Sequence, residues 1–581
     1  NNATKNYLQA AILLHNKKKN IVSYRFNHLN YSNAFSGNKH ELKSKITLKK
    51  SFFSVNSSFL ENTSTEENNS FLRAKAKVEH SFNKKWVGAF INYESNLRKN
   101  SSTQEFINTS HRFKEYETYF GIGDSTNVFT KIGVNYRNND SIKSNTFTRI
   151  NDRKTFYIDS KLVQKEQTNL SVFANYRHTK NSFTNNIEKS LNSKIIFNQQ
   201  LLNRFINLGS VYETSSGNIA RQEYMYVKTE PGFGYYTWID YNSDGIKDFD
   251  EFEIAEFQDQ AAYLRIPKPN IQFIATQRAK FTQSITLNPK IWSSQKGMKK
   301  IVSKFYNQSF LSVENEQERI GNSFNFNPFD LNEDKLLGLS LNLRNSLFFN
   351  KNLQKYSVTY TFGKTRNKQQ YFIGSQENNI KLHQITLAHK FKTFWLFELL
   401  GKNSKNDLIT ENFSTRNYNI HSNEIEPKIS FLYDENNRFT AFYHFKNKKN
   451  QLLNFENLAQ QKFGLEYFYR SKKKNQISAN INMFINDFTG DTNTPVAYQM
   501  LEGLQAGKNF TWSLLFNKKL NSYLNLNLNY LGRKSENSKT IHSQVKKESC
   551  VSDDVVDISL SNLEITSDPV KDSVYSFAEK A

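Results

Sequence analysis

Several features that define common protein classes are nearly absent from this sequence. Among 581 residues there is a single cysteine, Cys550, so no intrachain disulfide can form. No run of about 18 apolar residues occurs, which excludes a transmembrane helix. Before about residue 546 there is no Pro-rich or Ser/Gly-rich stretch of the kind that separates domains. A soluble protein of this length would be divided into several domains, because single cores stop growing at about 250–300 residues.

Catalytic motifs are missing as well. The 11 histidines are scattered, and neither H-E-x-x-H nor G-x-S-x-G occurs. His383 and His389 share a face of one predicted strand, where a lumen or surface position is a more common explanation than metal binding. We therefore expect that the protein is not an enzyme.

What the sequence has in abundance is alternation of apolar and polar residues. Residues 524–530 read LNLNLNY, and the same period of two runs through residues 72–79, 337–344, 356–362 and 477–486. This period places alternate side chains on opposite faces of a β-strand, so each strand has one apolar and one polar face. The chain is therefore predicted to be all-β, with almost no helix between the strands.

Composition indicates what covers the apolar faces. Hydrophobic residues make up 37% of the chain and the mean hydropathy is −0.70, which is low for a protein with a large soluble core. In a membrane barrel only one face of each strand is apolar, and aromatic residues (14% here) form girdles at both interfaces. We predict a large transmembrane antiparallel β-barrel of roughly 22–26 strands, spanning residues 1–545. A soluble, multi-sheet extracellular protein is the alternative.

The connections between strands are predicted to differ in length. Short connections rich in Asn and Lys lie at residues 83–85, 350–352 and 517–521, whereas longer polar connections lie at residues 62–70 and 180–190. Short turns on one side of the membrane and longer loops on the other are typical of outer-membrane barrels.

The net charge of +24 raises the question of nucleic-acid binding. The basic residues are spread over many polar strand faces and turns, and no zinc-ligand set or arginine-rich helix accompanies them. The abundance of Asn, Lys, Phe, Tyr and Ile is also expected for a protein encoded by an AT-rich genome. We expect no nucleic-acid partner. The expected partners are outer-membrane lipid and other outer-membrane or periplasmic proteins.

One local motif carries recognisable chemistry. Residues 240–251 read DYNSDGIKDFDE and match the calcium-loop pattern D-x-[DN]-x-[DN]-G-x5-E at every specified position. Gly245 permits the sharp turn. The predicted Ca²⁺ ligands are the side chains of Asp240, Asn242, Asp244, Asp248 (through water) and Glu251, with the main-chain carbonyl of Ile246.

The motif also has a simpler explanation, which is a solvated acidic loop that uses Asp-Gly turn chemistry. Residues 232–238, GFGYYTW, precede the loop, so it is not flanked by a helix pair as in a sensor EF-hand. The expected role of Ca²⁺ is structural: it stiffens a long insertion at residues 230–262. Modules of this type bind with a Kd of about 10⁻⁴–10⁻³ M.

Two longer segments carry a family resemblance. Residues 230–245 (EPGFGYYTWIDYNSDG) followed by 251–260 (EFEIAEFQDQ) resemble a signature of large outer-membrane β-barrel proteins from Bacteroidota. Residues 494–512 (TPVAYQMLEGLQAGKNFTW) resemble a second signature near the end of the same proteins. The resemblance spans about residues 220–545. It implies a barrel fold and a location in the bacterial outer membrane, but this family is functionally unassigned and supplies no activity.

The two ends of the chain differ from the usual pattern of a barrel. The sequence begins at Asn1 without a signal peptide, and we expect an exported protein that lacks its N-terminal part here. Residues 546–581 are expected to be an atypical acidic tail, disordered or not native to the barrel, because residues 551–581 hold seven acidic and two basic residues.

Two functions fit these observations. The first is a transport or translocation channel, or a component of an outer-membrane complex, although the sequence shows no TonB-box or plug-domain pattern. The second is a structural or adhesive outer-membrane protein with calcium-stabilised loops and a closed lumen. Ion conductance distinguishes the two hypotheses.

Overall fold

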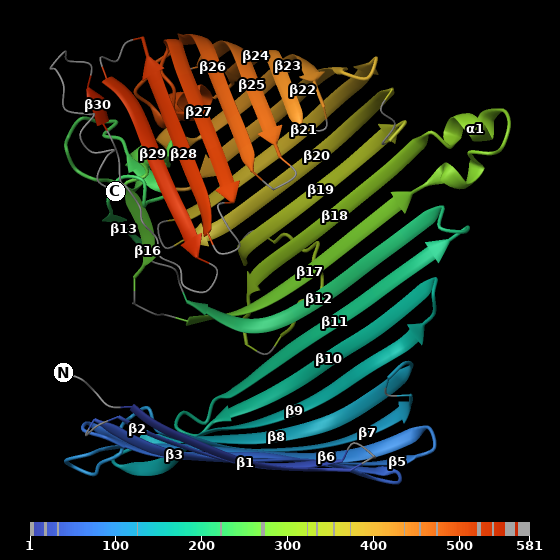
Figure 1. The fold of residues 1–581 in the computed structure, drawn as a ribbon, viewed down its shortest axis with the longest axis vertical. Coiled ribbons are helices and arrows are strands. Elements are labelled where there is room, and N and C mark those ends of the chain that lie inside the picture. Colours follow the sequence, from blue (N-terminus) through green and yellow to red (C-terminus); the bar gives the residue numbers. More distant parts are fainter. Residues whose placement is uncertain are drawn as a thin grey trace.

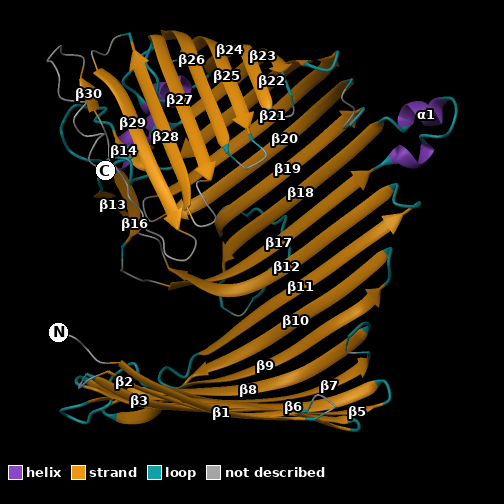
Figure 2. Cartoon of the chain, viewed as in Figure 1, coloured by secondary structure: helices purple, strands orange, loops and turns teal. Residues whose placement is uncertain are grey.

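The protein is built almost entirely from β-strands, arranged in one very long sheet and one small sheet. The computed structural model describes residues 5–551 and 564–566 apart from residues 17–19, 32–33, 125, 221–223, 269–272, 322, 333–334, 352–354, 372–373, 435, 453–454, 472–474, 520–523 and 537–539. Figure 2 shows how few helices interrupt the strands. Among the described residues, no helix is long and apolar enough to cross a membrane.

The main sheet contains 26 strands. The first part is β1 (Lys5–His15), β2 (Ile21–Tyr31), β3 (Phe35–Leu48), β4 (Ser51–Ser64), β5 (Glu67–Phe82), β6 (Lys85–Asn100), β7 (His111–Gly123), β8 (Phe129–Lys143), β9 (Thr146–Gln164), β10 (Thr168–Asn181), β11 (Ile187–Leu201) and β12 (Ile206–Ala220). The second part is β17 (Phe273–Leu287), β18 (Phe305–Glu318), β19 (Leu336–Phe349), β20 (Tyr356–Tyr371), β21 (Gly374–Phe391), β22 (Trp395–Thr410), β23 (Tyr418–Leu432), β24 (Asn437–Asn450), β25 (Asn457–Arg470), β26 (Gln476–Thr489), β27 (Gly507–Lys519), β28 (Leu524–Ser535), β29 (Thr540–Val551) and β30 (Glu564–Thr566).

The remaining elements are short. The small sheet is made of β13 (Tyr224–Lys228), β14 (Tyr236–Trp238), β15 (Phe252–Ile254) and β16 (Tyr263–Pro267), with 3-10 turns η1 (Phe249–Glu251) and η2 (Gln258–Gln260) between them. The helices between strands of the main sheet are η3 (Pro289–Trp292), α1 (Met298–Val302), η4 (Ser414–Arg416) and α2 (Pro495–Leu501). We call residues 224–268, the described part of the segment that leaves the main sheet, the insertion.

Every strand of the main sheet pairs antiparallel with the next, and β12 pairs directly with β17. From β1 to β29 the strands of the main sheet are 11–19 residues long, which equals or exceeds the roughly 9–11 residues that a tilted strand needs to cross a bilayer. The sheet bends into an arc that is open between β1 and the C-terminal strands (Figure 1). The predicted all-β, antiparallel, barrel-type fold is confirmed.

An antiparallel meander returns to the same rim at every second connection. The short predicted connections at residues 83–85, 350–352 and 517–521 therefore share one rim, and those at residues 62–70 and 180–190 share the other with the insertion. The latter two are shorter than predicted because the strands continue through their polar residues. In the first of them, the side-chain amide of Asn69 donates to Asn62 Oδ1 at 3.0 Å within the ladder between β4 and β5.

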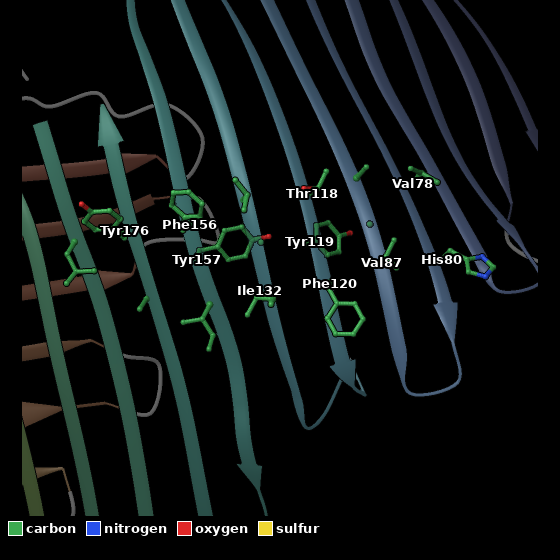
Figure 3. A pocket seen from close by; sticks show the side chains of 17 residues that line it. Val78, His80, Val87, Thr118, Tyr119, Phe120, Ile132, Phe156, Tyr157 and Tyr176 are labelled. Atoms are coloured by element: carbon green, nitrogen blue, oxygen red, sulfur yellow. The ribbon is translucent and has the colours of Figure 1, made fainter. Parts of the chain in front are cut away.

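The two faces of the sheet differ as the alternation predicts. In β6 and β7, Trp86 and Tyr119 are 6% and 7% exposed, whereas their neighbours Val87 and Phe120 are 43% and 42% exposed. The first face is rich in ion pairs that join neighbouring strands, such as Arg73–Glu94, Lys131–Glu117 and Lys402–Glu424. The second face is largely apolar, and Val87, Phe120, Ile132 and Phe156 line a shallow hollow on it (Figure 3).

Aromatic rings lie flat over glycines where the sheet bends. A Cβ on Gly88 would lie 2.2 Å from the ring of Tyr119 on the next strand. A Cβ on Gly121 would lie 2.1 Å from the ring of Trp86. Tyr119 is also fixed at its far end, where its hydroxyl donates to Glu79 Oε2 at 2.7 Å. Such covering of strand glycines by aromatic rings fixes the register of a curved sheet. Packing against the rings therefore explains why glycine occupies positions 88 and 121.

Candidate functional site

The insertion folds around an aromatic cluster. The rings of Tyr226 and Phe252 stack with centroids 3.9 Å apart, and Tyr263 meets Phe252 edge-on at 5.1 Å. Phe252 and Tyr263 are buried. Gly234 lies so close to β16 that a Cβ would be 2.5 Å from the backbone nitrogen of Tyr263. The aromatic and glycine residues of the first signature therefore build the small sheet itself.

Helix α2 closes over the inner face of the sheet near the same rim. Thr494 caps its N-terminus by accepting from the amide of Ala497 at 3.1 Å, and Pro495 occupies the first turn, where it needs no hydrogen-bond donor. Its buried residues form an apolar cluster with strands β22, β23 and β25; the members are Leu408, Tyr418, Ile420, Leu458, Val496, Met500 and Leu501. This cluster fixes α2 on the barrel wall.

The two segments that resemble the family signatures contact each other. The hydroxyl of Tyr498 in α2 donates to the carbonyl of Ile254 at 3.1 Å and accepts from the amide of Glu256 at 3.2 Å. The side chain of Asn493 donates to the carbonyl of Tyr241 at 3.2 Å. Segments that lie about 240 residues apart in the sequence therefore form one unit. We take this unit, together with the wall residues that hold it, as the candidate functional site.

Two arginines of the wall hold the insertion. Arg416, at the end of η4, donates to the carbonyls of Asp250 and Phe252, each at 3.1 Å, and to Glu253 Oε2 at 2.9 Å. On β28, Arg533 donates to Asp259 Oδ1 at 2.9 Å. Charged hydrogen bonds of this kind are stronger than neutral ones and are directional. The insertion is thus placed against the inner, ion-paired face, and Figure 1 shows β13 and β16 at the open side of the arc.

A third ionic contact lies under the end of α2. Lys446 and Lys448 on β24 both donate to Glu502 Oε1, each at 2.8 Å. The side chains of both lysines are only 11% exposed. Glu502 adopts the left-handed conformation, with φ of 55°, at the C-terminus of the helix. One carboxylate therefore compensates two nearly buried ammonium groups.

An aromatic cavity of about 240 Å³ separates part of the insertion from the rim of the sheet. The guanidinium of Arg265 lies 4.9 Å from the centre of the Tyr224 ring and 5.8 Å from that of Tyr371 on β20. Contacts between a cation and an aromatic face are attractive but broad in geometry. On this side, the insertion is therefore separated from the wall in part by the cavity and contacts it in part through cation–aromatic pairs that tolerate small shifts.

The predicted calcium ligands lie together in one loop of the insertion. The amides of Asp244 and Gly245 donate to the two carboxylate oxygens of Asp240 at 3.2 and 2.9 Å. The amide of Ile246 donates to Asp244 Oδ1 at 2.6 Å, and the side chain of Asn242 donates to Asp244 Oδ2 at 3.0 Å. Gly245 has φ of +73°, a conformation that favours glycine.

Glu251 and Asp248 complete the loop. Glu251 is 3% exposed, and its Oε2 accepts from Trp238 Nε1 at 2.8 Å and from the amide of Asp248 at 3.4 Å. Its other oxygen, Oε1, has no hydrogen-bond partner. In the described part of the chain, no three His, Cys, Asp or Glu side chains are gathered as a metal site. Calcium binding therefore stays a prediction at this point.

Burial raises the pKa of two carboxyl groups in the insertion. The pKa of Glu253 rises to about 7 because burial outweighs the opposing charge of Arg416. The pKa of Glu256 is also raised, by burial and by the negative charge of Glu502. For Glu502 burial acts in the same direction, but Lys448 and Lys446 overcome it and lower the pKa to about 2.

The pKa of Glu253 predicts pH-dependent docking of the insertion. A raised pKa means that the docked state binds a proton more tightly than the undocked state, so docking strengthens as the pH falls from about 8 to about 5. We expect a protease to cleave residues 231–262 faster at pH 8 than at pH 6, after correction for its activity on a free peptide. In Glu253→Gln this ratio should approach one; an unchanged ratio would assign the pH dependence to another group.

The residues that hold the insertion on the barrel wall cannot be recognised in the sequence. Arg416 and Glu253 are 163 residues apart, and Arg533 and Asp259 are 274 apart. Nothing local marks such a partner, because the pairing follows from the register of the many strands between the two residues. The predicted bounds of the insertion, residues 230–262, also omitted β13 and β16, since these strands resemble those of the barrel.

No family model matches the chain, and no curated protein matches it. Three solved structures share its arrangement of strands in part. The copper transporter OprC gives a TM-score of 0.30 at 7% identity, over 91% of this chain and 74% of that one. The FrpB iron transporter from Neisseria meningitidis gives 0.32 at 9%, over 91% and 77%. The outer membrane transporter YddB from Escherichia coli gives 0.28 at 8%, over 90% and 75%.

These similarities are too low to transfer a substrate or a role.

Proposed function

We propose that this chain is an outer-membrane β-barrel that acts as a transport or translocation channel, and that the insertion is its internal plug. The observation that carries the proposal is the position of the insertion on the inner, ion-paired face, held by Arg416 and Arg533. Barrels of more than 20 strands have a wide lumen, which is either open or plugged. A segment anchored inside such a lumen controls its passage.

The contacts of the insertion suit a plug that can be displaced. Its own aromatic cluster is internal, so the small sheet keeps its core when it moves. Its contacts to the wall include the hydrogen bonds of Arg416, Arg533 and Tyr498 and the edge of an incompletely filled cavity. Polar contacts of this kind are exchanged for water at moderate cost, unlike a continuous apolar interface.

The apolar face of the sheet supports a membrane location. Residues such as Val87, Ile91, Phe120 and Ile132 are 42–52% exposed and lie on the same face of adjacent strands. A contiguous apolar surface of this extent requires a cover. We propose that outer-membrane lipid supplies it. Other outer-membrane or periplasmic proteins, as parts of a larger complex, remain a prediction.

The test is ion conductance in planar bilayers with a plug deletion. Lys228 pairs with Tyr263, and the amide of Thr229 donates to the carbonyl of Ala262 at 2.7 Å. A short Gly-Ser turn can therefore replace residues 229–262 without moving the ends of β13 and β16. We expect low conductance from the intact chain and a rise of at least severalfold from the deletion variant. Shortening the connection at residues 293–303 on the opposite rim should leave conductance unchanged.

Migration of unheated and boiled samples on SDS gels shows which variants form a barrel. A heat-modifiable deletion variant that conducts no better than the intact chain would contradict the channel and support the second hypothesis, a structural or adhesive protein with a closed lumen. Equal rises in the deletion and the control would show that the insertion does not block the path.

A further inference from the structure

We propose that residues 240–251 form a site for a divalent cation, with Ca²⁺ as the best-suited ion, and that the bound ion locks the edge of the insertion that Arg416 holds. The predicted ligand atoms of the loop are all oxygens, which hard cations such as Ca²⁺ prefer. The inference does not depend on whether the lumen conducts, because it concerns the order of the insertion itself.

The buried carboxylate of Glu251 points to a ligand. It is 3% exposed and its Oε2 is already used by Trp238 and by the backbone of Asp248, within the loop. Its Oε1 is buried without any hydrogen-bond partner. A buried carboxylate oxygen without a donor is costly, and such groups are normally paired or coordinated. A cation in the loop supplies the missing partner.

The remaining donors can reach the ion by rotating their side chains. Asn242, Asp244 and Asp248 are exposed, and Asp240 is half-buried beside them. The exposed hydrogen bonds that Asn242 and Asp244 make within the loop can be exchanged for contacts with the ion at low cost. No three carboxylates converge in the described part of the chain, so ion binding requires this rotation. Ca²⁺ accepts six to eight oxygens in flexible geometry, whereas Mg²⁺ demands a strict octahedron and keeps its waters. A loop that adjusts around the ion therefore favours Ca²⁺.

The position of Glu251 links the ion to the wall. The next two residues are Phe252 and Glu253, and Arg416 binds the carbonyls of Asp250 and Phe252 and the carboxylate of Glu253. These contacts bracket Glu251 on both sides. An ion that fixes the Glu251 carboxylate also fixes the backbone on which Arg416 closes, so cation binding and docking strengthen each other.

Terbium luminescence tests the site in the full-length chain in detergent. Trp238 donates to the Glu251 carboxylate, so it lies next to the ion and transfers excitation to Tb³⁺. We expect saturable Tb³⁺ emission that Ca²⁺ displaces with a Kd of about 10⁻⁴–10⁻³ M. Glu251→Gln and Asp244→Asn should each weaken binding about tenfold or more, since each removes a charged ligand. Glu166→Gln, in an exposed turn on the opposite rim, is the matched control.

Trp238→Phe separates binding from sensitisation: the emission should fall while calorimetry still detects Ca²⁺. All variants are first required to show heat-modifiable migration, so that a loss of signal is not a loss of fold. Emission in Glu251→Gln equal to that of the intact chain, or no saturable emission from the intact chain, would overturn the cation site.

Proteolysis tests whether the bound ion holds the insertion against the wall. The insertion is digested either at a Ca²⁺ concentration 5–10 times the measured Kd or in the presence of a chelator. We expect Ca²⁺ to slow cleavage within residues 231–262 at least severalfold in the intact chain and to have no effect in Glu251→Gln. If Ca²⁺ binds but cleavage does not change, the cation site stands, but the proposal that the ion stabilises docking is wrong. Neither result uses conductance, so failure here is distinct from failure of the channel.

Discussion

Replacing Arg416 by alanine is expected to release the insertion from the barrel wall. The variant loses all three hydrogen bonds to Asp250, Phe252 and Glu253 and leaves the Glu253 carboxylate, which is 8% exposed, without its cation. At pH 8 Glu253, with a pKa of about 7, is ionised, and removing one partner of this buried charged pair costs about 2–4 kcal/mol. This corresponds to about a 30- to 1,000-fold shift of the docking equilibrium toward the undocked state. The cost is smaller at lower pH, where Glu253 binds a proton.

Limited proteolysis with mass mapping measures this shift. Cleavage within residues 231–262 should accelerate in Arg416→Ala, and the strands of the main sheet should stay intact. Arg416→Lys keeps the charge but not the planar fork of donors, so we expect an intermediate rate. Arg204→Ala, in an exposed turn on the opposite rim, is the matched control. Cleavage of Arg416→Ala at the rate of the intact chain would mean that the aromatic contacts alone hold the insertion.

If the insertion is the plug, the same substitution should also raise conductance. This is a second test of the plug by conductance, and unlike the deletion variant it leaves the chain at full length. A protease-sensitive Arg416→Ala variant that remains non-conducting would separate docking from gating, because the insertion would then be loose without leaving the lumen. The pair of measurements therefore distinguishes an anchoring residue from a gating one.

The fold follows from the sequence more directly than the site does. A period of two determines which side chains share a face, so residues 477–486 and 524–530 are sufficient to predict β26 and β28 and their apolar face. The lengths of the loops at residues 62–70 and 180–190 were overestimated. Asn and Ser are common in turns, but here they pair across strands, as in the contact between Asn69 and Asn62.

The site divides into a part that is local and a part that is not. Asp240 and Glu251 lie in one contiguous motif, so the sequence alone identifies the candidate loop. The meeting of Tyr498 with Ile254 depends on how far the sheet curves between β12 and β26, which no local pattern encodes. Both segments stand out in the sequence as signatures, and the contact between them gives a physical reason: each completes the hydrogen bonds of the other.

Replacing Glu502 by glutamine is expected to loosen α2. The carboxylate is the shared partner of Lys446 and Lys448, which are nearly buried, and glutamine leaves the two ammonium groups with only the charge of Glu424 nearby. Because the Glu502 side chain is itself 40% exposed, the loss should cost less than that of a fully buried pair, about 1–3 kcal/mol of local stability. Glutamine keeps the size of the side chain and the backbone preferences, so the left-handed conformation at residue 502 is not the variable. Amide exchange of residues 496–504 should accelerate about 5- to 160-fold.

The matched control is Glu536→Gln, whose partner Lys508 is 54% exposed; exposed pairs of this kind contribute at most about 1 kcal/mol.

Lowering the pH should reproduce the effect in the intact chain. Because the pKa of Glu502 is lowered to about 2, its contribution is complete above the unfolded pKa of about 4.5 and is lost as the pH falls toward 2.

A second substitution decides whether charge is the cause. In Glu502→Gln combined with Lys448→Met, one of the two uncompensated charges is replaced by an apolar side chain, and amide exchange of α2 should slow again. If Glu502→Gln alone leaves exchange unchanged, water from the lumen reaches both lysines and the carboxylate is not needed to hold the helix. Because Tyr498 lies on this helix and bonds to Ile254 and Glu256, a loosened α2 should also expose the insertion to protease. The two anchors, Arg416 and α2, would then act on the same docking equilibrium through adjacent residues of the insertion, Glu253 and Ile254.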